Sequence, residues 1–146
     1  MTAATALINT DEISTISTST IGLFGRFLVS ARTNHFVSDQ RAAAGGPGEA
    51  ATAGELLLAS LGSCSLGLIQ KTAVDNGIGL TAASTEVAFK RHASDPTQYE
   101  WLRIAVSLSG VTAAEAEALV GGFTSRCPIY NTLKRGGPVE ISWKVD

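Results

Sequence analysis

The longest apolar segment of the chain, residues 52–77, has the pattern of a buried helix. Leu57, Leu61 and Leu68 fall on one stripe at ~100° per residue, and further leucines occupy other directions. A helix that is apolar on nearly every side is usually buried in a core. The pattern therefore predicts a long central helix, with Thr52 capping its start and Gly77 ending it.

Segments rich in β-forming residues precede this helix. Residues 24–32 and 34–39 alternate and are separated by a short turn, so we expect a β-hairpin. A weaker first strand is expected within residues 12–19, after a loose arm of residues 1–10. Residues 41–51 form a loop rich in Gly and Ala that leads into the central helix.

After the central helix the period changes from helix to strand. Residues 84–92 and 101–110 alternate apolar and polar positions, which predicts a half-buried antiparallel hairpin. Thr112 opens a second helix with capping-box spacing, and residues 128–135 form a shorter one that begins with proline. A last strand is expected over residues 138–145. The order of elements predicts an α+β fold, with all 146 residues in a single domain.

Composition narrows the class of protein. A net charge of -2 with 16% charged residues gives no basic surface, so we expect no nucleic-acid partner. Gly and Ser interrupt the central segment, and Lys71 and Asp75 close it, so no membrane span is expected. The N-terminal segment lacks the charge and apolar run of a signal peptide, which favours a cytoplasmic location.

Two cysteines carry the main chemical signal. Cys64 lies near the middle of the central helix, among the small residues Ser60, Ser63 and Gly67. Cys127 stands directly before the proline-initiated helix, where the helix dipole can favour a thiolate. Free cysteine is often simply a buried apolar residue, so an inert structural role is the alternative. The pattern alone does not tell whether the two thiols are close in space.

The sequence gives little support for a metal site or a phosphate-binding site. His35 and His92 could join the two cysteines as metal ligands, but no pair has ligand spacing, so no metal is expected. The GGPG segment lacks the Lys-Ser/Thr of a phosphate-binding loop. We therefore expect no cofactor.

The segments around the two cysteines resemble one family. ELLLASLGSC, which ends at Cys64, followed by CPIYNTLKRGGPVEISW, which begins at Cys127, is similar to the osmotically inducible protein C and organic hydroperoxide resistance (OsmC/Ohr-like) superfamily. NHFVSD with the later GGPGEA also resembles that family's approach to its central helix. The resemblance extends from about residue 24 to the end of the chain.

This resemblance implies an OsmC-like fold, in which a curved antiparallel sheet surrounds the long buried central helix. It also implies an intertwined homodimer with two active sites at the interface. The activity it implies is a thiol peroxidase that acts on organic hydroperoxides and is recycled by a dithiol reductant. Cys64 would be the peroxidatic cysteine and Cys127 the resolving one. Oxidation of a thiolate to a sulfenic acid, followed by disulfide formation, fits a pair of thiols.

The resemblance further implies an arginine, from an N-terminal strand, that lowers the pKa of the peroxidatic thiol. Arg32 is the first candidate because it lies just before the NHFVSD segment, on one face of its predicted strand. Arg26 shares that face and Arg41 lies in the following loop, so both remain alternatives.

A glutamate near the start of the central helix would hold that arginine. The hydroperoxide resistance branch has it ten residues before the first cysteine, where this chain has Gly54. Glu55 stands nine residues before Cys64, which is half a turn out of phase on a straight helix. Glu55 is therefore either a site residue or only part of the helix cap.

Two rival functions remain open from sequence. One is a non-enzymatic dimeric module of the same fold that binds a small apolar or thiol-containing ligand. The other is a purely structural domain. Cys127 favours redox cycling over both, because a module that only binds has no use for a resolving thiol.

Overall fold

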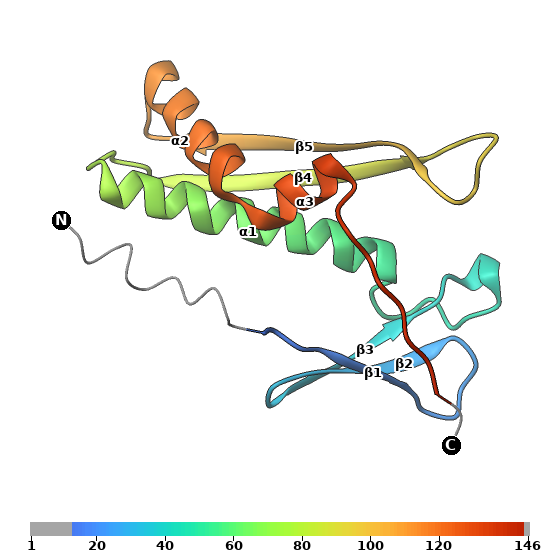
Figure 1. Ribbon diagram of the computed structural model, residues 1–146. Coiled ribbons are helices and arrows are strands. Elements are labelled where there is room, and N and C mark those ends of the chain that lie inside the picture. Colours follow the sequence, from blue (N-terminus) through green and yellow to red (C-terminus); the bar gives the residue numbers. More distant parts are fainter. Residues whose placement is uncertain (1–12, 145–146) are drawn as a thin grey trace. The chain divides into compact units, whose positions relative to one another are not determined.

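The computed structural model describes residues 13–144, so the arm predicted for residues 1–10 lies outside them. Runs of strands and runs of helices follow one another along the chain and the strand pairs are antiparallel, which confirms the α+β class (Figure 1). Contacts divide the chain into two compact units, a strand unit that ends at Ala53 and a helical unit that begins at Gly54. A single domain of 146 residues stays a prediction.

The strand unit is a three-stranded antiparallel sheet in the order β1-β2-β3. β1 spans Ser17–Thr20, β2 spans Arg26–Ala31 and β3 spans Asn34–Asp39, followed by the 3-10 helix η2 at Ala42–Ala44. The predicted hairpin is confirmed, but β2 ends before Arg32. Arg32 has a φ of 56° and lies in the tight turn between β2 and β3, where the chain reverses.

The helical unit contains a long two-stranded hairpin. β4 spans Ala82–Arg91 and β5 spans Tyr99–Ser109, in agreement with the alternating pattern. Apolar side chains of the hairpin pack against the buried core of this unit, with Arg103 on the opposite, exposed face of β5. These packed residues are Ala83, Val87, Leu102, Ile104, Val106 and Leu108. This hairpin forms one wall of the core.

The central helix α1 spans Ala53–Asp75, and Gly77, with a φ of 62°, follows its end as predicted. Gly62 lets the helix approach β4 closely, since a Cβ there would lie 2.9 Å from Thr85 Oγ1. Within the single chain α1 is not buried on every side, and the expectation that a second subunit covers the rest of it stays a prediction. Its buried positions form one face, and an opposite face is exposed at Ala59, Ser63, Gly67, Gln70 and Val74. By length and composition alone α1 could cross a membrane, a property that core helices of soluble proteins share.

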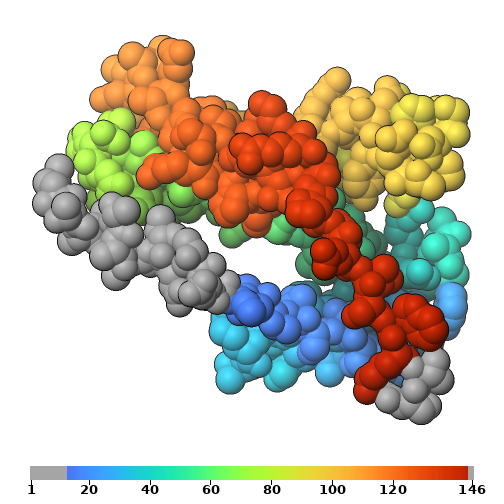
Figure 2. All heavy atoms as spheres, viewed as in Figure 1, coloured from blue at the N-terminus to red at the C-terminus, as the bar shows by residue number. Residues whose placement is uncertain are grey.

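Two shorter helices cover the other side of the core. α2 spans Ala113–Arg126, and its predicted capping box is present: Thr112 Oγ1 accepts from the Glu115 amide, and the Glu115 carboxylate accepts from the Thr112 amide. α3 spans Pro128–Arg135 and begins with proline as predicted. Figure 2 shows the atoms of both helices over α1. Leu119, Phe123 and Cys127 from this side pack with the buried face of α1.

The last predicted strand is not formed. Residues 138–144 have no helix or strand structure, and no described strand pairs with them. The pattern that predicted a strand is nevertheless visible, because Val139, Ile141 and Trp143 are 93%, 93% and 84% exposed. A strand needs a neighbour for its backbone hydrogen bonds, and a single chain supplies none at this segment.

Candidate active site

The two cysteines meet at the centre of the helical unit. Cys64 is half-buried in the middle of α1, and Cys127 is completely buried at the junction of α2 and α3. Their Sγ atoms lie 2.8 Å apart, and both are free thiols. The sequence did not establish this proximity. The separation allows the pair to form a disulfide with little movement of the backbone.

The helix junction holds Cys127 through several hydrogen bonds. Its amide donates to Phe123 O at 2.9 Å, and its carbonyl accepts from the Asn131 amide at 3.0 Å. Its Sγ accepts from the Tyr130 amide at 3.3 Å, so the sulfur itself caps the N-terminus of α3. The prediction that Cys127 stands at a helix N-terminus is therefore confirmed.

The surroundings of Cys64 disfavour its thiolate. Burial raises the pKa of Cys64 to about 11, and the hydrogen bond and charge of Cys127 act in the same direction. The backbone amide of Ile129 lowers this pKa, but by less. No cation is among the described groups that shift it. Cys64 is thus a protonated thiol at neutral pH in this arrangement, and a nucleophilic role requires a positive charge from elsewhere.

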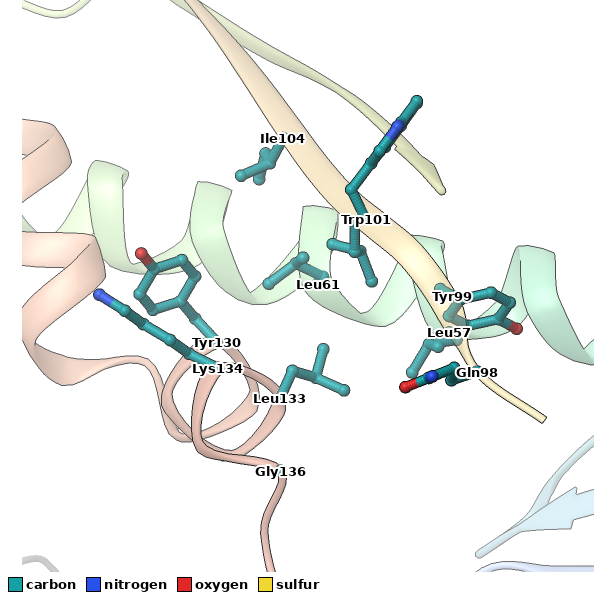
Figure 3. Close-up of a pocket in the computed structure, with 11 residues that line it drawn as sticks. Leu57, Leu61, Gln98, Tyr99, Trp101, Ile104, Tyr130, Leu133, Lys134 and Gly136 are labelled. Carbon is teal, nitrogen blue, oxygen red and sulfur yellow. The ribbon is translucent and has the colours of Figure 1, made fainter. Parts of the chain in front are cut away.

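Residues of α1, β5 and α3 line a pocket of about 620 Å³ (Figure 3). Leu61 on its wall is one turn of α1 before Cys64, and Tyr130, also on the wall, donates its amide to Cys127 Sγ. Figure 3 shows Leu57 and Leu61 of α1 lying opposite Leu133 of α3. The lining is mostly apolar, with Gln98 and Lys134 as polar members, and comprises Leu57, Leu61, Gln98, Tyr99, Trp101, Leu102, Ile104, Tyr130, Leu133, Lys134 and Gly136.

The pocket was missed at the sequence level. Lys134 of α3 is a polar residue of the pocket wall, and its Nζ lies 5.7 Å from the centroid of the Tyr130 ring. The available signal was the amphipathic pattern of residues 128–135, in which Ile129, Tyr130 and Leu133 share one side. That pattern predicts packing but does not show which residues leave a space between them.

Arg26 belongs to an ion-pair cluster of the strand unit. Its Nε and Nη2 donate to the two carboxylate oxygens of Asp39, each at 2.9 Å, and Nη2 also donates to Glu49 at 2.7 Å. Asp39 Oδ2 further accepts from the Glu49 and Ala50 amides at 3.0 and 2.8 Å. The Arg26 guanidinium and these amides hold the pKa of Asp39 well below its usual range. Arg26 therefore joins β2, β3 and the following loop.

The remaining predicted residues are exposed. Arg32 lies in the β2–β3 turn, and Arg41 immediately precedes η2. Glu55 lies in the first turn of α1, four residues before Ala59 on the exposed face. Of the four predicted site residues, the structure brings together Cys64 and Cys127. The roles of Arg32 and Glu55 stay predictions.

The described residues include no group of three or more His, Cys, Asp or Glu side chains that could hold a metal ion. His35 Nδ1 instead lies 2.8 Å from Ser30 Oγ, and His92 Nδ1 accepts from the Asp95 amide at 3.1 Å. The histidines lie in different units of the chain.

Known structures share this fold at low sequence identity. An OsmC-like protein from Mycoplasma pneumoniae is 18% identical, with a TM-score of 0.70 over 85% of this chain and 89% of that one. An organic hydroperoxide resistance protein OsmC from Legionella pneumophila is 21% identical, with a TM-score of 0.67 over 85% and 90%. An organic hydroperoxide resistance protein from Elizabethkingia anophelis is 14% identical, with a TM-score of 0.71 over 87% and 91%. None of the curated proteins matches the chain significantly.

The architecture is thus the expected OsmC-like fold. Residues 46–142, which include α1, both cysteines and the pocket, match the family model described as OsmC-like protein. Proteins of this kind are typically soluble, and some are named for organic hydroperoxide resistance. Because the match covers well over half of the chain, this protein belongs to the OsmC-like family.

Proposed function

We propose that this protein is a cysteine-based thiol peroxidase that reduces organic hydroperoxides to alcohols. The observation that carries the proposal is the pair of free thiols, Cys64 and Cys127, 2.8 Å apart beside an apolar pocket. Two structurally similar proteins bear the name of organic hydroperoxide resistance proteins, which supports the same activity.

In the first step the Cys64 thiolate attacks one oxygen of the hydroperoxide. The O–O bond breaks, Cys64 becomes a sulfenic acid, and the other oxygen leaves as the alcohol after it takes up a proton. Cys64 is the attacking thiol because it is half-buried, whereas Cys127 has no exposed surface. The apolar pocket would hold the organic part of the hydroperoxide beside it.

In the second step the Cys127 sulfur attacks the sulfur of the sulfenic acid. A disulfide forms between Cys64 and Cys127 and water leaves, so the peroxide's two-electron oxidation is now stored in the disulfide. A dithiol then reduces the disulfide through a mixed disulfide and restores both thiols. The 2.8 Å separation supports an intramolecular disulfide rather than one with another molecule.

The first step needs a cation, since burial raises the pKa of Cys64 to about 11. We propose Arg32 for this role, with Arg41 as the alternative. Arg26 is the weaker candidate because its guanidinium already binds Asp39 and Glu49. Glu55 would orient the arginine. Its exposed position in the first turn of α1 is equally compatible with a capping role alone.

We also propose that the active form is an intertwined, cytoplasmic homodimer. One face of α1 is exposed, and Val139, Ile141 and Trp143 alternate along an unpaired segment. A second copy would cover these apolar side chains and supply the missing strand neighbour. Sedimentation at micromolar concentration should give twice the chain mass, and Trp143→Lys should shift the protein toward monomer. A wild-type monomer under these conditions would contradict the dimer.

The proposed activity is tested by following consumption of an organic hydroperoxide with a dithiol reductant. The wild-type protein should turn over and Cys64→Ser should be inactive, because serine lacks a nucleophile of comparable strength at neutral pH. Ser65→Ala, one position along α1, is the matched control and should keep activity. Equal rates for wild type and Cys64→Ser would rule out the proposal.

A second candidate is a non-enzymatic module that binds a small apolar or thiol-containing ligand. The observation that favours it is that neither cysteine lies on the wall of the 620 Å³ pocket. In that case hydroperoxide consumption would be absent, while Leu61→Trp, which fills the pocket, would abolish binding of an apolar fluorescent probe. A peroxidase would lose both probe binding and turnover on the same substitution.

A further inference from the structure

Arg126 links α2 to the central helix immediately before Cys127. Its Nε donates to Gly122 O at 3.0 Å, one turn earlier in α2. Its Nη2 donates to the hydroxyl of Thr72 on α1. The guanidinium thus connects the last turn of α2, which ends at the cysteine, to a fixed point on the helix that carries Cys64.

Thr72 offers a well-defined anchor for this contact. The residue is buried, with 7% of its surface exposed, and its hydroxyl donates to Leu68 O at 2.7 Å. The same oxygen accepts from Arg126, so both of its hydrogen-bonding roles are used. Thr72 lies eight residues after Cys64, which places it about 12 Å further along α1 and ~80° around the helix axis.

Gly122 permits the close approach that the contact requires. A Cβ at this position would lie 2.5 Å from Thr72 Oγ1 and 2.9 Å from its Cγ2. Any larger residue would therefore push α2 away from α1. The glycine, the threonine and the arginine form one contact between the two helices, which we name the Thr72–Arg126 clasp.

We infer that Arg126 is a positioning residue, which holds Cys127 within reach of Cys64 through the Thr72–Arg126 clasp. Apolar packing is non-directional, so the buried side chains of α2 do not by themselves fix where this helix lies on α1. The clasp is a directional contact about 12 Å along α1 from the sulfur pair, and the two together set the position of the α2–α3 junction. Asn131 completes the arrangement, since its side-chain amide donates to both Thr124 O and Cys127 O at 3.0 and 2.8 Å and so ties α3 to α2.

The catalytic meaning of this inference rests on the proposed peroxidase activity. A sulfenic acid on Cys64 either condenses with Cys127 or meets a second hydroperoxide and becomes a sulfinic acid. The clasp favours the disulfide by keeping the second thiol in place. Loss of the clasp should slow that second step and leave the first step unchanged, because Arg126 contacts neither sulfur.

The geometry can be tested without any peroxide. In a glutathione redox buffer, the ratio of intramolecular disulfide to dithiol gives the effective concentration of one thiol at the other. Arg126→Ala and Thr72→Val should each lower this value on the order of tenfold, as for loss of one hydrogen bond to a charged group. The double variant should fall no further than either single one, since both remove the same contact. Arg135→Ala, which removes a positive charge from the end of α3, is the matched control and should leave the value unchanged.

The peroxide experiment then separates this inference from the proposed function. With excess organic hydroperoxide, mass spectrometry should detect more sulfinic acid on Cys64 in Arg126→Ala than in wild type, while the first oxidation proceeds at the wild-type rate. An unchanged effective concentration in both clasp variants would overturn the positioning role. A wild-type Cys64 that does not react with hydroperoxide would overturn the peroxidase function alone, because the glutathione result stands without it.

Discussion

Two polar pairs, one in each unit, show opposite effects of their surroundings on ionisation. Asp39 has almost no exposed surface, yet Arg26 and two backbone amides hold its pKa well below the usual range. Cys64 is more exposed than Asp39, yet burial and a second thiol raise its pKa to about 11. The difference lies in the donors, since Asp39 accepts four hydrogen bonds, two from the cationic Arg26 and two from backbone amides.

Among the described residues, the cysteine pair lacks the cation and the donors that Asp39 has. A buried acid stays ionised where donors and a cation replace its water, and it keeps its proton where they do not. Arg26 already serves the first pair, so a nucleophilic Cys64 requires a different positive charge. An arginine would meet that requirement, and Arg32 is the first candidate because of its position before the NHFVSD segment.

Substitution of Arg32 should change the reactivity of Cys64 more than any other change considered below. If its guanidinium lies near Cys64, the pKa of the thiol falls by about 1–3 units, which changes the thiolate fraction at neutral pH about 10–1,000-fold. Arg32→Ala should therefore move the midpoint of Cys64 alkylation up toward pH 11. The midpoint is read from the rate of reaction with a thiol-specific alkylating agent against pH.

Arg26→Ala and Arg41→Ala serve as controls for this measurement. Each removes one positive charge from the strand unit, and neither should shift the alkylation midpoint of Cys64. An unchanged profile for Arg32→Ala together with a shifted one for Arg26→Ala or Arg41→Ala would mean that the wrong arginine has been assigned.

A smaller effect is expected at the other pair. Because the pKa of Asp39 is lowered in the folded state, the stability it contributes is present above its unfolded pKa of ~3.9 and is lost as pH falls below that value. Asp39→Asn should be less stable than wild type at pH 7 but should lose less stability between about pH 4 and 2. Urea unfolding at several pH values, followed by circular dichroism, measures this difference.

Asp75→Asn is the matched control for the acid experiment. Asp75 forms an exposed pair with Lys71 at 3.0 Å on the last turn of α1, and such pairs contribute little. Its substitution should leave the acid dependence as in wild type. If Asp39→Asn loses as much stability at low pH as the wild type does, the Asp39 carboxylate is not the source of that loss.

Local patterns predicted most of the fold. Period-2 alternation located both hairpins, and the spacing of Thr112 and Glu115 identified the capping box that opens α2. Proline after Cys127 correctly indicated the start of α3. These features depend on residues close together in the sequence, where propensity and capping act directly.

Two segments differ in the single chain from what their sequence patterns predict, because both depend on a neighbour. The pattern of residues 138–145 predicted a strand, but a strand forms only with a neighbour, and that neighbour is absent from the described chain. The all-round apolar pattern of α1 likewise predicted burial, and one face of α1 is exposed in the single chain, where a second subunit is expected to cover it. In both cases the apolar pattern of a segment shows which side chains can be buried. It does not show which other segment or subunit packs against them.

The candidate site was predictable only in part. The residue types and motifs pointed to Cys64 and Cys127, but their 2.8 Å separation results from the packing of α1 against the α2–α3 junction. The sequence placed Arg26 on the same strand face as Arg32 but did not predict its ion pair with Asp39, a residue 13 positions away across the hairpin. Contacts of this kind depend on strand register and helix crossing, which no local pattern specifies.

The peroxidatic role of Cys64 and the resolving role of Cys127 can be tested by mass spectrometry of Cys127→Ser after one equivalent of organic hydroperoxide. We predict a sulfenic acid trapped on Cys64 and no disulfide, while Cys64→Ser remains unoxidised over the same time. A sulfenic acid on Cys127 in the Cys64→Ser protein, formed as fast as oxidation of the wild type, would contradict the account and reverse the two roles.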